Sequence, residues 1–239
     1  MKIGPLFKWF GSKWQSAKRY PPPQHDTIVE PFAGGAGYSL NYCDRQVKLA
    51  EADPNLLHLW SWLIHEARQQ DVLDIPIDLP VGADISALGL CLGQQMLLKH
   101  WQRTNNVGDC WTVSPWGNKP GQWTASTRSR VAEEIQAIRH WSIGFGWPML
   151  WGAATWFIDP PYQYNYRYRR DLPTFAHEDL AVGVRALPVS AQIIVCEAAC
   201  KKTGRIPDYL PFVASHRSVT SRRKSTQAHH SNEVIYVRS

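Results

Sequence analysis

Residues 159–162 of the chain, Asp-Pro-Pro-Tyr, place an acidic side chain, two conformationally restricted residues and an aromatic ring directly after the apolar segment 155–158. Proline fixes its own φ at about −65° and keeps the residue before it extended, so the Asp159 carboxylate has one preferred direction. Carboxylate and carbonyl oxygens accept hydrogen bonds, and together they can hold the two N–H bonds of an amino group. The Tyr162 ring can stack on a flat heterocycle. These residue types predict a site for the exocyclic amine of a nucleobase.

A glycine-rich turn at residues 33–37 follows a second apolar segment, 27–32. Glycine has no Cβ and therefore lets a ligand approach the backbone closely. Asp53 lies 19 positions beyond Gly34, close to the spacing at which an acidic residue binds a ribose in nucleotide-binding sheets. The turn reads F-A-G-G-A-G and not G-x-G-x-x-G, which argues against NAD. It is compatible with a phosphate-free nucleoside such as S-adenosylmethionine.

The elements needed to position these residues alternate between strands and helices. Hydrophobic patterning predicts helices that open at 38–42 and that cover 54–70, 86–103 and 177–187, and a further helical stripe formed by Val131, Ile135, Ile138 and Trp141. Strands are predicted at 27–32, 47–52, 155–158, 192–195 and 233–237. Segments 71–85 and 104–127 are predicted to be a loop and an irregular insertion, and 212–230 is basic and polar. The alternation predicts a doubly wound α/β sheet with a ligand crevice at the carboxyl ends of its strands.

Composition limits the classes of protein to consider. The 239 residues carry a formal net charge of +6 and include 12 Trp, which is compatible with a polyanionic partner and with base stacking. The five cysteines form no C-x-x-C pair, so neither a metal site nor a disulfide framework is expected. No apolar run has the length of a secretory signal or of a membrane span. We therefore expect a cytoplasmic protein without membrane contact.

Four segments resemble, in family order, the motifs of the Dam-like adenine-N6 DNA methyltransferases. Phe7–Lys13 is similar to K-W-x-G-G-K with Ser12 at the second Gly, and Glu30–Ala36 is similar to E-P-F-x-G-x-G with Ala36 at the final Gly. Asp53–Asn55 resembles D-x-N, and Asp159–Tyr162 is the D-P-P-Y motif. The glycine loop precedes D-P-P-Y with a variable segment between them, which is the order of the alpha group.

The resemblance implies a Rossmann-like class I S-adenosylmethionine-dependent methyltransferase fold of the α/β class, with a small inserted target-recognition region. Asp159, Pro160 and Tyr162 would hold an adenine flipped out of double-stranded DNA, and its N6 would take the methyl group directly. No cysteine nucleophile and no metal ion are needed for that transfer. The expected cofactor-binding residues are Trp9, Lys13, Phe32, Gly34, Gly35, Asp53, Asn55 and Asp159.

The resemblance also divides the chain. Residues 1–70 would form the N-terminal arm and the cofactor-binding half, 71–150 the inserted target-recognition region, and 151–239 the catalytic half. A monomer or weak dimer of phage type, shielding DNA from restriction, is expected. The residues expected to contact DNA are basic or aromatic: Lys119, Arg128, Arg130, Tyr166, Arg167, Arg169, Arg222 and Arg223.

Other functions remain open. D-P-P-Y variants also serve RNA and cytosine-N4 amino-methyltransferases, and the product nucleoside distinguishes these from the adenine enzyme. A catalytically inactive homologue that only binds DNA is a second alternative. A nicotinamide-dependent oxidoreductase is disfavoured by the absence of G-x-G-x-x-G.

Overall fold

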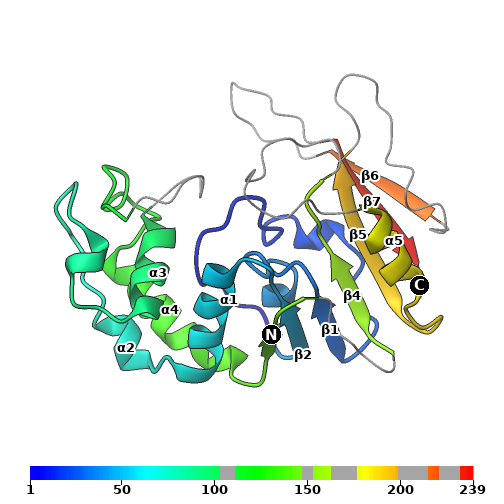
Figure 1. The fold of residues 1–239 in the computed structure, drawn as a ribbon, viewed down its shortest axis with the longest axis horizontal. Coiled ribbons are helices and arrows are strands. Elements are labelled where there is room, and N and C mark those ends of the chain that lie inside the picture. The colour runs from blue at the N-terminus through cyan, green and yellow to red at the C-terminus, as the bar shows by residue number, and fades with distance from the viewer. Residues whose placement is uncertain (103–110, 147–152, 163–176, 199–214, 221–231, 239) are drawn as a thin grey trace.

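The computed structural model describes residues 1–102, 111–146, 153–162, 177–198, 215–220 and 232–238. Within them, one sheet runs through the molecule in the order β3-β2-β1-β4-β5-β7-β6 (Figure 1). Strands β3, β2, β1, β4 and β5 are parallel, whereas β7 is antiparallel to both β5 and β6. The strands are β1 Thr27–Glu30, β2 Gln46–Ala50, β3 Ser142–Gly144, β4 Thr155–Ile158, β5 Gln192–Ala198, β6 Ser215–Thr220 and β7 Asn232–Arg238.

This strand order brings the two sequence motifs together. From β1 the chain winds outward to β2 and β3, and on the other side of β1 it continues through β4 to β5. In doubly wound sheets the ligand crevice lies at the carboxyl ends of the two strands where the winding reverses. Here those strands are β1, which ends before the glycine-rich turn, and β4, which ends before Asp159. The mixed α/β, mostly parallel sheet that was predicted is confirmed and is compatible with a Rossmann-like fold.

Helices pack on both sides of this sheet. Figure 1 shows α1–α4 grouped on one side of the molecule and α5 against the strands on the other. Short 3-10 turns lie at Ala17–Arg19, Ser39–Tyr42, Ile85–Ala87 and Ile135–Ile138, and a π-helical turn, Trp62–Glu66, continues α1. The α-helices are α1 Pro54–Ser61, α2 Gln69–Leu73, α3 Leu92–Trp101, α4 Ala125–Glu134 and α5 His177–Arg185. No helix in the described parts of the chain is long and apolar enough to span a bilayer.

Several predicted boundaries are wrong. The helix expected over 54–70 stops at Glu66, because Ala67 and Arg68 have extended ψ angles, and α2 then occupies the start of the expected loop 71–85. The helix expected from residue 86 begins at Leu92. Strand β1 ends at Glu30, before the predicted end at residue 32, and β5 continues to Ala198, beyond the predicted end at residue 195. Strands β3 and β6 were not predicted.

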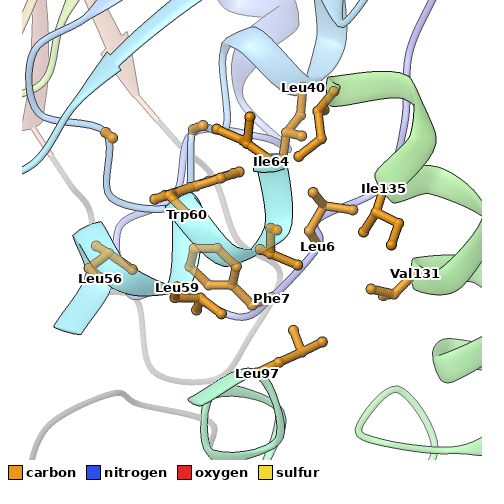
Figure 2. Packing of buried hydrophobic residues seen from close by; sticks show 14 of the residues in the cluster. Leu6, Phe7, Leu40, Leu56, Leu59, Trp60, Ile64, Leu97, Val131 and Ile135 are labelled. Carbon is orange, nitrogen blue, oxygen red and sulfur yellow. The ribbon is translucent and has the colours of Figure 1, made fainter. Parts of the chain in front are cut away.

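One large hydrophobic cluster joins the N-terminal arm, the sheet and the helical group. Figure 2 shows Leu6 and Phe7 of the arm among side chains from α1, α3 and α4. The Phe7 ring meets the fully buried Trp60 edge-on, with 5.1 Å between ring centroids. The arm therefore supplies core residues to both the sheet and the helices, and its position is fixed by apolar burial.

The second face of the sheet is covered by α5. Leu180 and Val184 of this helix pack with Trp156 of β4 and Ile193 of β5. Neighbouring residues in these strands, such as Phe157 and Ile194, belong to the other cluster, as the alternation of side chains along a strand requires. Both faces are thus buried, which is the usual state of a parallel sheet.

Candidate functional site

An ion pair between the arm and D-P-P-Y forms the centre of the site. Lys13 Nζ donates to both carboxylate oxygens of Asp159, at 2.7 Å to Oδ1 and 2.6 Å to Oδ2. The same ammonium lies 3.2 Å from the Gly11 carbonyl oxygen. The two side chains are only 11% and 21% exposed, so water screens the pair weakly. A single nitrogen donor can therefore engage both oxygens of this carboxylate.

Tyr162 completes this arrangement. Its half-buried ring packs against the main hydrophobic cluster, and Lys13 Nζ lies 5.1 Å from the ring centroid. Pro160 is buried between Asp159 and Tyr162. The structure thus places Lys13, a predicted cofactor-binding residue, against the predicted catalytic residues Asp159 and Tyr162.

Glu30 adds a second acidic side chain behind the ion pair. It is buried at the end of β1, and its Oε1 accepts a hydrogen bond of 2.7 Å from the Ser39 backbone N–H. The pKa of Glu30 is raised to about 8, chiefly because the side chain is buried; the nearby Asp159 carboxylate also raises it, whereas the Ser39 bonds and Lys13 lower it. With this pKa, Glu30 is mostly protonated at neutral pH. An uncharged Glu30 does not compete with Asp159 for the positive charge of Lys13.

The glycine-rich turn packs directly against the N-terminal arm. A Cβ on Gly37 would lie 2.4 Å from the Trp14 backbone nitrogen and 2.6 Å from that of Lys13. A Cβ on Gly34, which has a φ of +48°, would lie 2.8 Å from Trp9 Nε1. The absence of a Cβ at Gly34 and Gly37 therefore lets the N-terminal arm pack closely against the turn. The sequence predicted that a ligand would approach the glycines closely, and in the structure the arm segment that carries Lys13 lies there.

Ala36 occupies the left-handed region as well, with a φ of 45°. This residue stands where the family pattern has a glycine. The left-handed conformation costs a residue with a Cβ roughly 1–2 kcal/mol. The turn keeps its shape because Ala36 is fully buried and its N–H bonds to the Ala33 carbonyl.

Glu51, which the sequence analysis did not single out, links the turn to the next strand. It is the first residue after β2, and its Oε2 accepts a hydrogen bond of 3.0 Å from the Gly34 N–H. Its Oε1 accepts bonds of 2.9 and 3.0 Å from the N–H groups of Ala52 and Asp53. Burial raises the pKa of this carboxyl group. Glu51 thus lies at the strand end where a ribose-binding acid is expected.

The predicted ribose ligand Asp53 makes a structural contact at the start of α1. Its Oδ1 accepts a hydrogen bond of 2.9 Å from the Asn55 N–H and so caps α1. Asn55 itself is exposed at the first turn of that helix. Phe32, another predicted cofactor residue, packs against the cluster under α5. Asp53 lies three positions after the end of β2 at Ala50, and its role in ribose binding stays a prediction.

A shallow open depression of about 210 Å³ lies at the ends of β2 and β3, next to Glu51. Leu49 and Ala50 line one side, and Ser142–Gly146 line the other. The Glu51 N–H bonds to the Gly144 carbonyl at this edge. Phe145 is 74% exposed there. An accessible aromatic ring thus lines this hollow, together with Lys48 of β2.

The predicted DNA contacts fall into two groups. Lys119 lies 3.6 Å from the ring centroid of the exposed Trp116. Arg128 donates to the Ile75 carbonyl at 3.0 Å, and Arg130 donates to the Pro5 carbonyl at 2.9 Å and pairs with Glu134. These two arginines have contacts within the protein, and their role in DNA binding stays a prediction. The remaining residues lie outside the described ranges: Tyr166, Arg167, Arg169, Arg222 and Arg223.

Among the described residues, no group of three or more His, Cys, Asp or Glu side chains could hold a metal ion. No protein-family model matches the chain, and no curated protein matches its sequence.

Proposed function

We propose that the chain is an S-adenosylmethionine-dependent DNA methyltransferase that modifies the N6 amine of adenine. The observation that carries the proposal is the Asp159 carboxylate, which lies at the switch point of the sheet and accepts a hydrogen bond on each of its oxygens from one nitrogen, Lys13 Nζ. An exocyclic amine also offers two N–H groups on one nitrogen. The carboxylate therefore suits such an amine as a hydrogen-bonding partner.

The residues of the motif have distinct roles in this proposal. Asp159 and the Pro160 carbonyl accept the N6–H bonds, which draws the nitrogen lone pair out of conjugation with the ring. Tyr162 stacks on the flipped adenine and offsets part of the few kcal/mol that flipping costs. The reaction is accelerated by positioning and electrostatics, and no covalent bond to the protein forms.

The residues at the ends of β1 and β2 fit the cofactor. Bound S-adenosylmethionine supplies an electrophilic methyl group on a sulfonium centre. Glu51 would accept hydrogen bonds from the ribose hydroxyls, and Phe145 offers an exposed ring on which an adenine can stack. Phe145 lines a hollow of about 210 Å³, and Glu51 directly follows Ala50, another residue of that lining. No phosphate-binding helix end is required there.

DNA as the substrate rests on charge and on the resemblance. The net charge of +6 favours a polyanion. Within the segment 71–150, the exposed pair Trp116 and Lys119 combines a stacking surface with a cation, a combination suited to nucleic acid. Residues 71–150 would supply the target recognition.

The test is a transfer assay with labelled S-adenosylmethionine, using unmethylated DNA and an RNA control. We expect N6-methyladenine in DNA, identified by mass. Asp159→Asn should lower the rate at least about a hundred-fold, because the amide presents one acceptor oxygen and an N–H donor toward the amine. Asp179→Asn, at an exposed aspartate of α5, is the matched control and should keep the wild-type rate.

Each other outcome of the assay would indicate a different function for the chain. Label in cytosine or in RNA would replace the adenine assignment by one of the alternative amino-methyltransferases. DNA binding without any transfer would identify an inactive homologue. Full activity in Asp159→Asn would overturn the catalytic assignment itself.

A further inference from the structure

His177 lies against the D-P-P-Y segment from the start of α5. Its Nε2 atom is 2.8 Å from the Pro161 carbonyl oxygen. A carbonyl oxygen only accepts hydrogen bonds, so Nε2 carries a hydrogen and donates it. The His177 side chain is 19% exposed, which shields this bond from water.

Glu197 approaches the same imidazole nitrogen. Its Oε1 lies 3.7 Å from His177 Nε2, and its side chain is fully buried in β5, the strand next to β4. The other carboxylate oxygen accepts a bond of 3.0 Å from the Ala198 N–H. A buried carboxyl group is costly unless donors or positive charge face it. His177 is thus placed between Glu197 and the Pro161 carbonyl.

The composition of D-P-P-Y explains why such a contact matters. Pro160 and Pro161 have no N–H groups, so the segment cannot anchor itself at these positions by donating hydrogen bonds. At these two positions the carbonyl oxygens are the backbone groups that can form hydrogen bonds, with donors from other elements. His177 supplies a donor of this kind at Pro161, one residue before Tyr162 and two after Asp159.

We propose that His177, with Glu197 beside its Nε2 atom, is a positioning residue that fixes the D-P-P-Y segment so that the Asp159 carboxylate and the Pro160 carbonyl converge on the target amine. This role rests on the proposed methyl transfer. His177 does not touch the substrate, and its effect passes through the backbone of Pro161. A misplacement of about 1 Å at a reacting centre can cost on the order of a hundred-fold in rate.

Two substitutions separate the hydrogen bond from the volume of the ring. His177→Leu removes the donor, whereas His177→Gln keeps an N–H group at a similar reach. We expect His177→Leu to lower kcat by about ten- to a hundred-fold with the KM values for cofactor and DNA within about twofold, and His177→Gln to recover most of the rate. A loss confined to KM, or no recovery by Gln, would overturn the positioning role.

His140→Leu is the matched control. His140 Nε2 contacts the Arg45 carbonyl at 2.9 Å, the same kind of bond on an exposed surface. This variant should keep the wild-type kcat.

A second readout does not depend on activity. Hydrogen exchange in a peptide that covers 153–162 should speed up in His177→Leu, return toward the wild-type rate in His177→Gln and stay unchanged in His140→Leu. If the wild-type protein methylates no nucleic acid, the proposed function fails, and the exchange rates still decide whether His177 holds the segment. Unchanged exchange in His177→Leu would show that it does not.

Discussion

Three ionisable side chains, Lys13, Glu30 and Asp159, come together at the carboxyl ends of β1 and β4. Lys13 and Asp159 form a closely spaced ion pair, and Glu30 is buried beside them with its pKa raised to about 8. The protonated state of Glu30 prevents a surplus of negative charge in a region that water hardly reaches. The net charge of the site therefore depends on the protonation of Glu30 as well as on the Lys13–Asp159 ion pair.

Glu30 makes stability depend on pH. The folded protein holds a proton on Glu30 up to about pH 8, whereas the unfolded chain releases it near 4.5. Because the folded state binds more protons in this window, the contribution of Glu30 to the free energy of unfolding falls as pH rises from about 4.5 to 8. Glu30→Gln should remove this pH dependence, which amounts to at most about 5 kcal/mol over the whole range.

The measurement is urea unfolding at pH 5, 6.5 and 8. Glu30→Gln should gain stability relative to wild type as pH rises. The control is Glu133→Gln, at an exposed glutamate of α4, which should follow the wild-type dependence. Parallel curves for wild type and Glu30→Gln would contradict the buried, protonated carboxyl.

At this scale the sequence predicted Asp159, Pro160 and Tyr162 together, because the two prolines and the preceding apolar run identify a strand end. It did not predict Glu51, since Asp53 satisfied the usual spacing from the glycines and β2 ends earlier than expected. It also could not foresee the Lys13–Asp159 pair, whose partners lie 146 residues apart. Such a contact depends on how the arm packs.

At the scale of elements, the arm and the glycine-rich turn form one unit. The turn has no side chains where the arm crosses it, and Gly37 faces the backbone of Lys13 and Trp14. Backbone atoms cannot move aside as the end of a flexible side chain can. The position of Lys13 relative to Asp159 therefore depends on the absence of a Cβ at residue 37.

We expect Gly37→Ala to lower the free energy of unfolding by at least about 2 kcal/mol, since overpacking against backbone forces the arm to shift. It should also weaken transfer by displacing Lys13. Gly144→Ala is the control, because a Cβ at Gly144 meets no atom within 4 Å. Thermal or urea unfolding of both variants measures the difference, and equal stabilities would contradict the close packing of the arm.

The elements that the sequence did not predict share a physical cause. β3 has only three residues, Ser-Ile-Gly, too few for any periodicity to appear, and it exists by pairing with β2. β6 has the polar sequence SHRSVT and pairs with β7 alone. Edge strands of this kind are determined by their neighbours, whereas the apolar strands β1, β4 and β5 are visible in the sequence.

At the scale of the whole molecule, a single core crosses the divisions predicted at residues 70 and 150. The cluster includes Phe7 and Trp60 before the first division, Leu97 and Trp123 between the two, and Phe157 after the second. The helical segment therefore has no separate core among the described residues. Its α2, α3 and α4 are stabilised by the same contacts that fix the arm.

We accordingly expect Leu97→Ala, in α3, to destabilise the entire protein by about 2–5 kcal/mol and to leave one unfolding transition. Leu97 is fully buried, so the change opens a cavity. Far-ultraviolet circular dichroism and Trp fluorescence should report the same midpoint. Val182→Ala, at a residue that is 63% exposed, should change stability by less than about 0.5 kcal/mol. Two separate transitions in Leu97→Ala would show that the helical segment unfolds on its own.

The antiparallel strand β7 also has a consequence for biosynthesis. It lies between β5 and β6, so β6 is attached to the sheet only through a strand that follows it in the chain. A polypeptide that leaves the ribosome from its N-terminus can form β1, β2, β4 and β5 early, because their parallel pairs need only earlier residues. The edge of β5 stays open until residues 232–238 emerge, and during that interval chaperones or other nascent chains have access to it.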